Sequence, residues 1–196
     1  MRRTQHDRST STRADLVAAG RALFATRGYH AVPADEIVRA AGVTRGALYH
    51  HYGDKQGLFR AVVEELEREL TAEVEAAFAG APDTLAGMLG ALDVFLTACL
   101  RAEVRQISLT DAPAVLGWAT WREIEAAHGL GLLVDVLSRG MAEGLIVRQP
   151  VRALAQLVLA AVMEAARMIA DAADPEAARA EAQQVLGAWF AVLTVH

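Results

Sequence analysis

Apolar residues recur at spacings of three and four along most of the chain, which is the period of an amphipathic helix. The two-residue alternation that indicates a β-strand is absent. Alanine and leucine, both strong helix formers, account for 41 and 23 of the 196 residues. The pattern predicts an all-α protein.

Glycines and capping residues divide the front of the chain into short helices. A hydroxyl or carboxylate just before an apolar run caps a helix, and a glycine just after it ends one. The expected helices are 12–27 with Thr12 as its cap, 33–41 opening at Pro33, 45–52 with Thr44 as its cap, and a longer helix that follows Asp54 and has Lys55 in its first turn.

Two of these short helices are joined by a glycine turn. Ala40 and Ala41 are small enough for a close crossing, Gly42 is free to turn, and Val43 supplies an apolar plug. These are the proportions of a helix-turn-helix. An ordinary corner between two packed helices uses the same residue types, so the spacing alone leaves both interpretations open.

Charge is distributed unevenly between the two ends of the chain. The whole sequence has 19 Lys+Arg and 24 Asp+Glu, a net charge of −5 that by itself argues against a polyanionic partner. Residues 1–60, however, carry +5 and residues 61–196 carry −10. This asymmetry indicates two modules with different partners. We expect a helix-turn-helix domain at 1–54, with an arm at 1–11, and a helical domain at 55–196.

The outward side of the third short helix carries hydrogen-bonding side chains and no acid. Arg45 can donate a pair of hydrogen bonds to guanine in a major groove, and Gly46 lets the backbone approach closely. Polar side chains nearby can contact phosphates. The candidate DNA-binding residues are Thr44, Arg45, Gly46, Tyr49, His50 and Lys55.

The pair His50 and His51 also suggests a metal ligand set. Adjacent helical residues point about 100° apart, and no third ligand follows at the next turn. We therefore expect no metal site. Arg2, Arg3 and Arg8 are candidates for an arm that contacts phosphates or a minor groove, although a solvated tail has the same composition.

The run from Leu16 to Val63 resembles the TetR/AcrR family of bacterial transcriptional regulators. The residues that carry the resemblance are IVRAAGVTRGALYHHY and DKQGLF. The resemblance implies a homodimer on a near-palindromic, double-stranded DNA operator, with half-sites about 34–36 Å apart or a multiple of it. Many members have Thr-Ser where this chain has Val32-Pro33, so the phosphate contact of that hydroxyl is not expected here.

The acidic remainder is expected to form a helical bundle. Its predicted helices are the continuation of the one after Asp54, then 84–99 opened by Asp83, 130–143, 151–172 and 175–195. Adaptable Met and aromatic side chains in the middle helices suit the wall of an apolar pocket, and the resemblance implies a small hydrophobic effector there. The candidate pocket residues are Met88, Leu92, Phe95, Cys99, Trp118 and Trp121. Ordinary core packing accounts for the same residues.

The last two helices have apolar stripes with small residues between them, which permit close packing between helices. The family places its four-helix dimer interface here, and core packing explains the stripes equally well. The candidate interface residues are Leu157, Ala161, Ala165, Val185, Trp189 and Leu193.

Several classes of protein are not expected. A single cysteine, Cys99, excludes an intramolecular disulfide and a cysteine zinc site, and suits a reducing cytosol. Apolar stretches such as Ala153–Met163 are short or interrupted for a bilayer span, and residues 1–10 lack the apolar core of a signal peptide. No nucleotide loop, metal cluster or nucleophile–base pair is evident, so neither an enzyme nor a cofactor is expected.

The sequence thus favours a cytoplasmic, dimeric repressor that is associated with the nucleoid when bound to DNA and is released from its operator by a small apolar effector. The alternatives are a ligand-independent helix-turn-helix protein and an activator.

Overall fold

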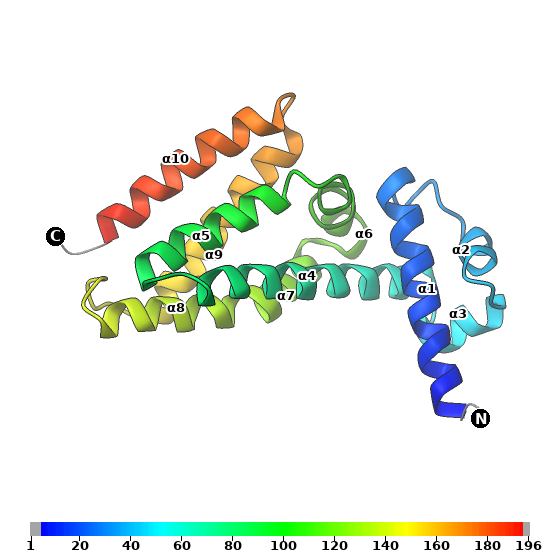
Figure 1. Ribbon diagram of the computed structural model, residues 1–196. Helices are drawn as coiled ribbons and strands as arrows, with labels where there is room; N and C mark the ends of the chain where they lie inside the picture. Colours follow the sequence, from blue (N-terminus) through cyan, green and yellow to red (C-terminus); the bar gives the residue numbers. More distant parts are fainter. Residues whose placement is uncertain (1–4, 194–196) are drawn as a thin grey trace. The chain divides into compact units, whose positions relative to one another are not determined.

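The computed structural model describes residues 5–193, and at residues 5–8 and 192–193 only the backbone. Within these limits the chain is built of helices joined by turns and loops and has no strand, which confirms the all-α prediction (Figure 1). The α-helices are α1 (Gln5–Arg27), α2 (Ala34–Ala40), α3 (Arg45–Tyr52), α4 (Lys55–Ala79), α5 (Thr84–Ala98), α6 (Ala112–Leu116), α7 (Trp118–Glu125), α8 (Gly131–Ala142), α9 (Val151–Asp171) and α10 (Pro175–Leu193). Two segments have π-helical turns, η1 (Val104–Asp111) and η2 (Ala126–Leu130).

The chain forms two compact units. The first, called the head below, contains the described residues up to Leu66 together with Ala102–Trp121. The second, called the body, contains Glu67–Arg101 and the described residues from Arg122 onward. Both α4 and α7 contribute residues to each unit. The boundary after residue 54, expected from the sequence, falls within the head, and Ala102–Trp121 joins the head from the middle of the chain.

Local signals place most helix ends as expected. Thr44 accepts a hydrogen bond from the Ala47 N–H at 3.3 Å and caps α3, and Asp54 accepts one from Gly57 at 2.7 Å at the start of α4. Gly53 ends α3 with a φ of +80°, a conformation that glycine adopts without steric cost. In the body, Asp83 caps α5 through the Ala86 N–H at 2.8 Å.

The first helix begins earlier than the sequence predicts. It starts at Gln5 rather than near Thr12, so Thr12 lies inside α1 and is not its cap. No glycine or proline interrupts Gln5–Ser11, and the Ser11 hydroxyl donates to Asp15 one turn on. Residues 5–11 of the expected arm are therefore helical. Arg2 and Arg3 lie outside the described residues, as does the side chain of Arg8.

The core of the head joins α1, α2, α3 and the start of α4. Phe24 and Phe59 are fully buried and meet edge to face, with ring centroids 5.2 Å apart. The other large residues at zero exposure in this core are Leu16, Val32, Ile37, Leu48, Leu58, Val62 and Val63. Burying a side chain of this size contributes about 1.5–3 kcal/mol, so this cluster holds short helices that are marginal in isolation.

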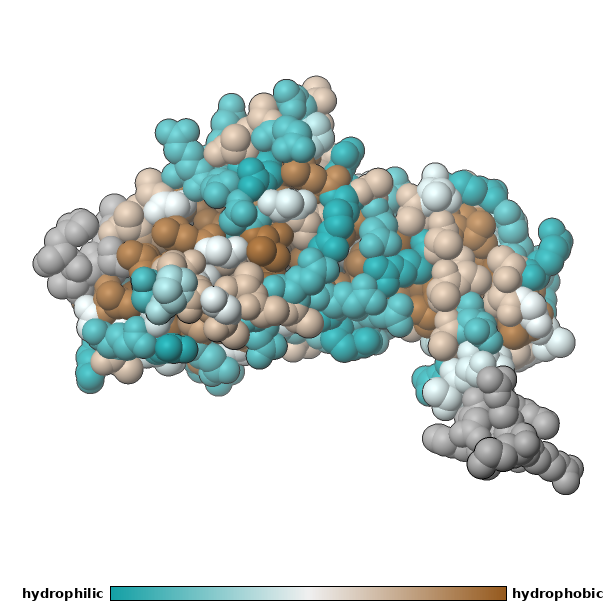
Figure 2. All heavy atoms as spheres, viewed as in Figure 1, coloured by the Kyte–Doolittle hydropathy of each residue, from teal (hydrophilic) through white to brown (hydrophobic). Residues whose placement is uncertain are grey.

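The body packs α5, α8, α9 and α10 around a second core. Met88, Val136, Leu137, Ile146 and Ala155 form its buried centre. Figure 2 shows apolar residues on the surface of this unit as well, most clearly along α5. By length and composition, α9 can cross a membrane, which corrects the expectation that the apolar stretches here are too short. This is weak evidence for a span, because core helices of soluble proteins pass the same test.

A substitution at Gly57 tests how closely the start of α4 packs against the end of α3. A Cβ at this position lies only 2.0 Å from the Tyr52 carbonyl oxygen, so Gly57→Ala forces the backbone apart. We expect the free energy of unfolding to fall by about 1–3 kcal/mol, measured by chemical denaturation.

The matched control is Gly46→Ala on α3, where the nearest atom to a Cβ is the Thr44 hydroxyl at 3.8 Å. That variant should keep or raise the unfolding midpoint, because alanine stabilises a helix relative to glycine. Equal midpoints for the two variants would contradict this close packing.

Candidate nucleic-acid interface and ligand cavity

The third helix of the head presents one polar, exposed face. Only Leu48 of α3 is fully buried, and it fixes the rotation of the helix about its axis. The predicted DNA-binding residues on this segment are all exposed: Thr44, Arg45, Gly46, Tyr49 and His50. Arg45 and Tyr49, one turn apart on α3, are joined by a hydrogen bond of 3.2 Å.

Arg45 is held in place by its neighbours on that face. Its guanidinium lies 3.1 Å from a carboxylate oxygen of Asp35 on α2 and donates to the Tyr49 hydroxyl at 3.2 Å. The Arg45 side chain is still 58% exposed. An arginine with this much free surface can exchange a solvent-exposed pair for a bidentate contact to a base at modest cost.

Lys55 is occupied by the head itself. Its ammonium donates to the carbonyl oxygens of Tyr29 and Val32, both at 3.0 Å, and lies 3.9 Å from the centre of the Tyr29 ring. Partial burial lowers the pKa of Lys55. The lysine thus ties the loop before α2 to the start of α4. An ammonium has three donors, so one remains for a phosphate oxygen.

The rings of the two adjacent histidines meet edge to face. The rings of His50 and His51 meet at a centroid distance of 5.0 Å with a steep interplanar angle of 65°. Burial, with the charges of His50 and Arg13, lowers the pKa of His51. Within residues 5–193, no three His, Cys, Asp or Glu side chains gather in a metal-binding group.

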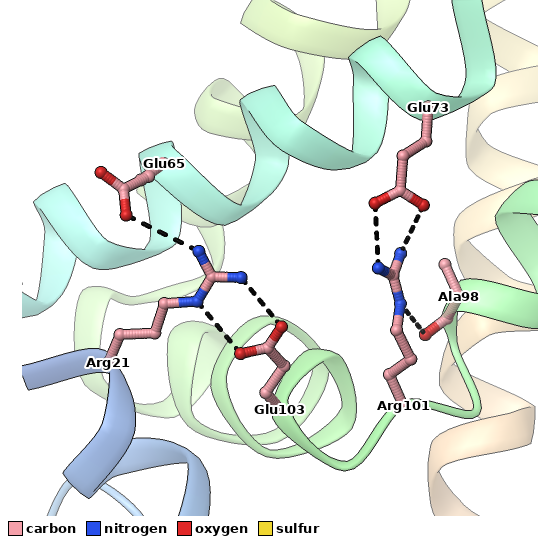
Figure 3. A network of polar contacts seen from close by, with 6 residues as sticks. All are labelled: Arg21, Glu65, Glu73, Ala98, Arg101 and Glu103. Atoms are coloured by element: carbon pink, nitrogen blue, oxygen red, sulfur yellow. Dashed lines mark hydrogen bonds and ion pairs between the residues drawn. The ribbon is translucent and has the colours of Figure 1, made fainter. Parts of the chain in front are cut away.

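Within the head, polar contacts attach the segment Ala102–Trp121 to α1 and to the loop that follows it. Arg21 donates to both oxygens of Glu103 at 2.8 and 3.0 Å, and lies 3.6 Å from Glu65 (Figure 3). Asp111 accepts from the Tyr29 backbone N–H at 2.7 Å. Residues 102–121 are therefore fixed to the head through charge-assisted hydrogen bonds, which are the stronger kind. Within the body, Arg101 makes a comparable bidentate pair with Glu73 (Figure 3).

The body contains an apolar cavity of about 120 Å³. Three phenylalanines, Phe78, Phe95 and Phe190, lie along its wall. Aliphatic and methionine side chains from α4, α5, α8 and α9 make up most of the rest. A cavity of 150 Å³ can hold a benzene molecule, so this one suits a compact ligand.

The predicted pocket residues divide into two groups. Met88, Leu92 and Phe95 line the cavity. Cys99 is fully buried but is not part of the wall, and burial raises the pKa of its thiol to about 12. Trp118 and Trp121 belong to the head, where their ring centroids lie 4.7 Å apart, and they do not line the cavity.

Two carboxyl groups face this apolar space. Glu125, at the end of α7, is 4% exposed, and neither of its carboxyl oxygens has a hydrogen-bond partner among the residues that the structure describes. Glu67 of α4 lies on the same wall. Burial, and next the charge of Glu67, raise the pKa of Glu125 to about 8, while Arg122 acts in the opposite direction. An unpaired carboxyl in such a site is costly to keep as a carboxylate.

Neither acid was predicted from the sequence as a site residue. Helical spacing contained the signal for Glu67, since it follows Val63 by four residues and precedes Val74 by seven. Glu125 follows Trp121 by four residues and Trp118 by seven, so it carries a similar signal on one side only. The π-helical turns that follow it alter the spacing on the other side.

A second apolar hollow lies between α9 and α10. Its volume is about 340 Å³, and its residues are Leu154, Leu157, Val158, Ala161, Leu186, Trp189 and Phe190. Of the predicted dimer residues, Leu157, Trp189 and Val185 are 70%, 57% and 51% exposed. Ala161 is partly exposed and Ala165 is buried, while the side chain of Leu193 lies outside the described residues.

Two family descriptions match separate parts of the chain. "Bacterial regulatory proteins, tetR family" matches residues 16–62, and "Tetracyclin repressor-like, C-terminal domain" matches residues 85–193. A TetR-family transcriptional regulator from Pectobacterium atrosepticum, known as a crystal structure, is 34% identical to this chain. The alignment covers 99% of both chains with a TM-score of 0.90.

More distant relatives match over less of their length or at lower identity. The HTH-type transcriptional repressor Rv1474c of Mycobacterium tuberculosis is 31% identical over 61% of this chain and 63% of its own. The first curated relatives are matched over 31 to 63% of their length. RolR in complex with resorcinol has the same fold, at 18% identity, 96% and 95% coverage and a TM-score of 0.69.

The raised pKa of Glu125 predicts how stability depends on pH. Its pKa in the folded protein is about 8, against an ordinary value of 4.5, so the folded protein holds a proton that the unfolded chain releases. The free energy of unfolding should therefore fall as pH rises from about 4.5 to 8. Glu125→Gln should remove this contribution and be more stable than the wild type at pH 8, with the difference shrinking toward pH 5.

Thermal unfolding across this pH range measures the effect. Glu123→Gln, two residues away and exposed, is the control and should follow the wild-type curve. Parallel curves for wild type and Glu125→Gln would show that Glu125 titrates normally.

The burial of Cys99 predicts that its thiol reacts slowly in the folded protein. Because the thiol is fully buried and its pKa is raised to about 12, it should react at pH 8 at least about 100-fold more slowly in the folded protein than in denaturant. Labelling with a chromogenic disulfide reagent measures both rates. Rapid labelling of the folded protein would contradict the burial.

Proposed function

We propose that this chain, which belongs to the TetR family of bacterial regulatory proteins, is a dimeric transcriptional repressor that binds operator DNA through α3. The observation that carries the proposal is the exposed face of α3 with Thr44, Arg45, Gly46, Tyr49 and His50. A helix with this face outward suits the major groove, where base edges are read.

Each residue has a defined part in the proposed complex. Arg45 reads a guanine, after exchanging its contact with Asp35 for one with the base. Tyr49 and His50 contact phosphates, and Gly46 admits the DNA backbone. Lys55 contributes its remaining donor to a phosphate while it continues to hold the loop before α2. The net charge of +5 over residues 1–60 favours this encounter.

A second copy of the chain covers the hollow between α9 and α10 in this proposal. Exposed Leu157, Val185 and Trp189 form an apolar surface of the kind that a homodimer buries. Two heads then read the half-sites of a near-palindromic operator. The protein acts in the cytoplasm, where the DNA is.

The cavity of the body binds the effector in this proposal. A ligand releases the operator only if it binds the released state more tightly than the DNA-bound state. Both α4 and α7 contribute residues to the head and to the cavity wall or its edge, so either can transmit the change. The second candidate is a ligand-independent regulator; the cavity favours the ligand-responsive form.

The Arg45→Ala substitution tests how DNA is read. We expect the affinity for a selected operator to fall about 5- to 150-fold, equivalent to 1–3 kcal/mol, and the base preference to relax at one position of each half-site. Fluorescence anisotropy with the operator and its single-base variants measures both.

Arg60→Ala is the matched control, since it removes the same charge from an exposed arginine that pairs with Glu64 on α4. It should lower the affinity for all sequences equally or leave it unchanged. Wild-type base preference in Arg45→Ala would refute the assigned reading residue.

The Leu157→Glu substitution tests the proposed dimer surface. A charge in the centre of an apolar interface remains without a partner, so the variant should be monomeric at concentrations where the wild type is a dimer. Sedimentation measures the state of each. Leu89→Glu alters a similarly apolar, 41% exposed residue on α5 and should stay dimeric; a dimeric Leu157→Glu protein would exclude this surface.

A further inference from the structure

Among the described residues, the wall of the cavity in the body combines apolar side chains with two acids and no basic residue. Among its lining residues only Glu67 and Glu125 are ionisable, and Thr71 is the only other polar side chain. The elements that surround the two acids otherwise contribute Leu, Val, Ala, Met, Phe and Gly. The positive charge of Arg122 lowers the pKa of Glu125, but Arg122 is not part of the cavity wall.

The described residues supply no hydrogen-bond partner for the carboxyl group of Glu125. Buried polar groups are almost always hydrogen-bonded, and each exception calls for a physical reason. At 4% exposure, with neither carboxyl oxygen hydrogen-bonded, Glu125 is such an exception, and it faces the cavity. A ligand that donates hydrogen bonds and carries positive charge satisfies both oxygens and offsets the charge of the neighbouring Glu67.

The aromatic wall favours the same ligand. Phe78, Phe95 and Phe190 line the cavity, and the faces of aromatic rings attract organic cations, more strongly when water is excluded. The volume of about 120 Å³ is smaller than the about 150 Å³ that holds benzene, but the cavity is partly open, so a compact molecule of one ring with its ammonium group can extend beyond the enclosed part.

We propose that this cavity is a binding site for a compact organic cation, a primary ammonium on a small apolar body, with the ammonium bound by Glu125 and Glu67. The inference rests on the proposed effector role of the cavity and specifies the effector's charge. The effector expected from the sequence was small and apolar; the structure adds a positive charge to that description.

Proton release gives the proposal a specific signature. At pH 7 the carboxyl of Glu125 is mainly protonated, because its pKa is about 8, whereas a bound ammonium requires the carboxylate. Glu67 and Arg122 are the charged groups that act on it. Binding of the cation at pH 7 should therefore release close to one proton, and the apparent affinity should rise toward pH 8.

The experiment is calorimetric titration of the full chain without DNA at pH 7. Benzylamine is the cationic probe, benzyl alcohol its neutral counterpart and benzoate its anionic one. Benzylamine should bind at least about tenfold more tightly than benzyl alcohol, and benzoate should not bind. Repeating the titration in buffers of different ionisation enthalpy counts the released proton.

Variants assign the preference to the two acids. Glu125→Gln should remove the preference for benzylamine and the proton release, and Glu67→Gln should weaken benzylamine binding while leaving benzyl alcohol unchanged. Thr71→Val, which alters the lining without changing its charge, should keep the wild-type preference. The Glu67 variant also provides the test if Glu125→Gln does not fold.

Three results would overturn the proposal: no benzylamine binding at millimolar concentration, equal binding of benzyl alcohol, or a wild-type preference in Glu125→Gln. The proposed regulatory function is measured separately, by operator release. Benzylamine binding without release would leave the cation site intact and refute the effector role. Release by a neutral or anionic ligand that does not need Glu125 would refute the cation site alone.

Discussion

The burial of Leu48 is the constraint on which the proposed DNA interface depends. A helix of eight residues is marginal in water, so α3 owes its existence to the packing of Leu48 into the head and to its ends at Thr44 and Gly53. Because only one of its side chains is fully buried, the rest of the helix is free to carry polar groups. The same contact that stabilises α3 therefore turns Arg45 and Tyr49 toward solvent. Lys55 supports this arrangement from the next helix, by holding two carbonyl groups of the loop that precedes α2.

The middle of the chain gives the head and the body common elements. Residues 102–121 are fixed to α1 by Arg21 with Glu103, and to the loop after α1 by Asp111 with the Tyr29 backbone. From there α7 runs on to Glu125, whose carboxyl faces the cavity of the body. An occupant that changes the charge or position of Glu125 acts on a helix whose first residues belong to the head. This covalent continuity is what the proposed effector response uses, together with α4.

Local chemistry made much of the fold predictable, and packing between distant residues did not. Glycines with positive φ and the caps at Thr44, Asp54 and Asp83 depend on a few neighbouring residues, so the helix boundaries around them were predicted correctly. The exposed position of the α3 residues follows from the same short-range pattern. Trp118 and Trp121 belong to the head, and Lys55 donates to backbone carbonyl groups of the head, through contacts between residues far apart in the sequence. Helical spacing does not predict such contacts. Glu125 was not predicted because helical spacing indicates which side chains share a face, whereas the burial of a carboxyl without a partner depends on packing against other helices.

The central claim is that the α3 face reads DNA sequence as part of a symmetric pair. The most direct measurement is selection by the wild-type protein from a library of randomised double-stranded DNA, followed by sequencing of the bound fraction. The account predicts enrichment of a near-palindrome whose half-sites are separated by about one helical turn, or a multiple of it, and include a guanine. Bound DNA with the same composition as the starting library would contradict it.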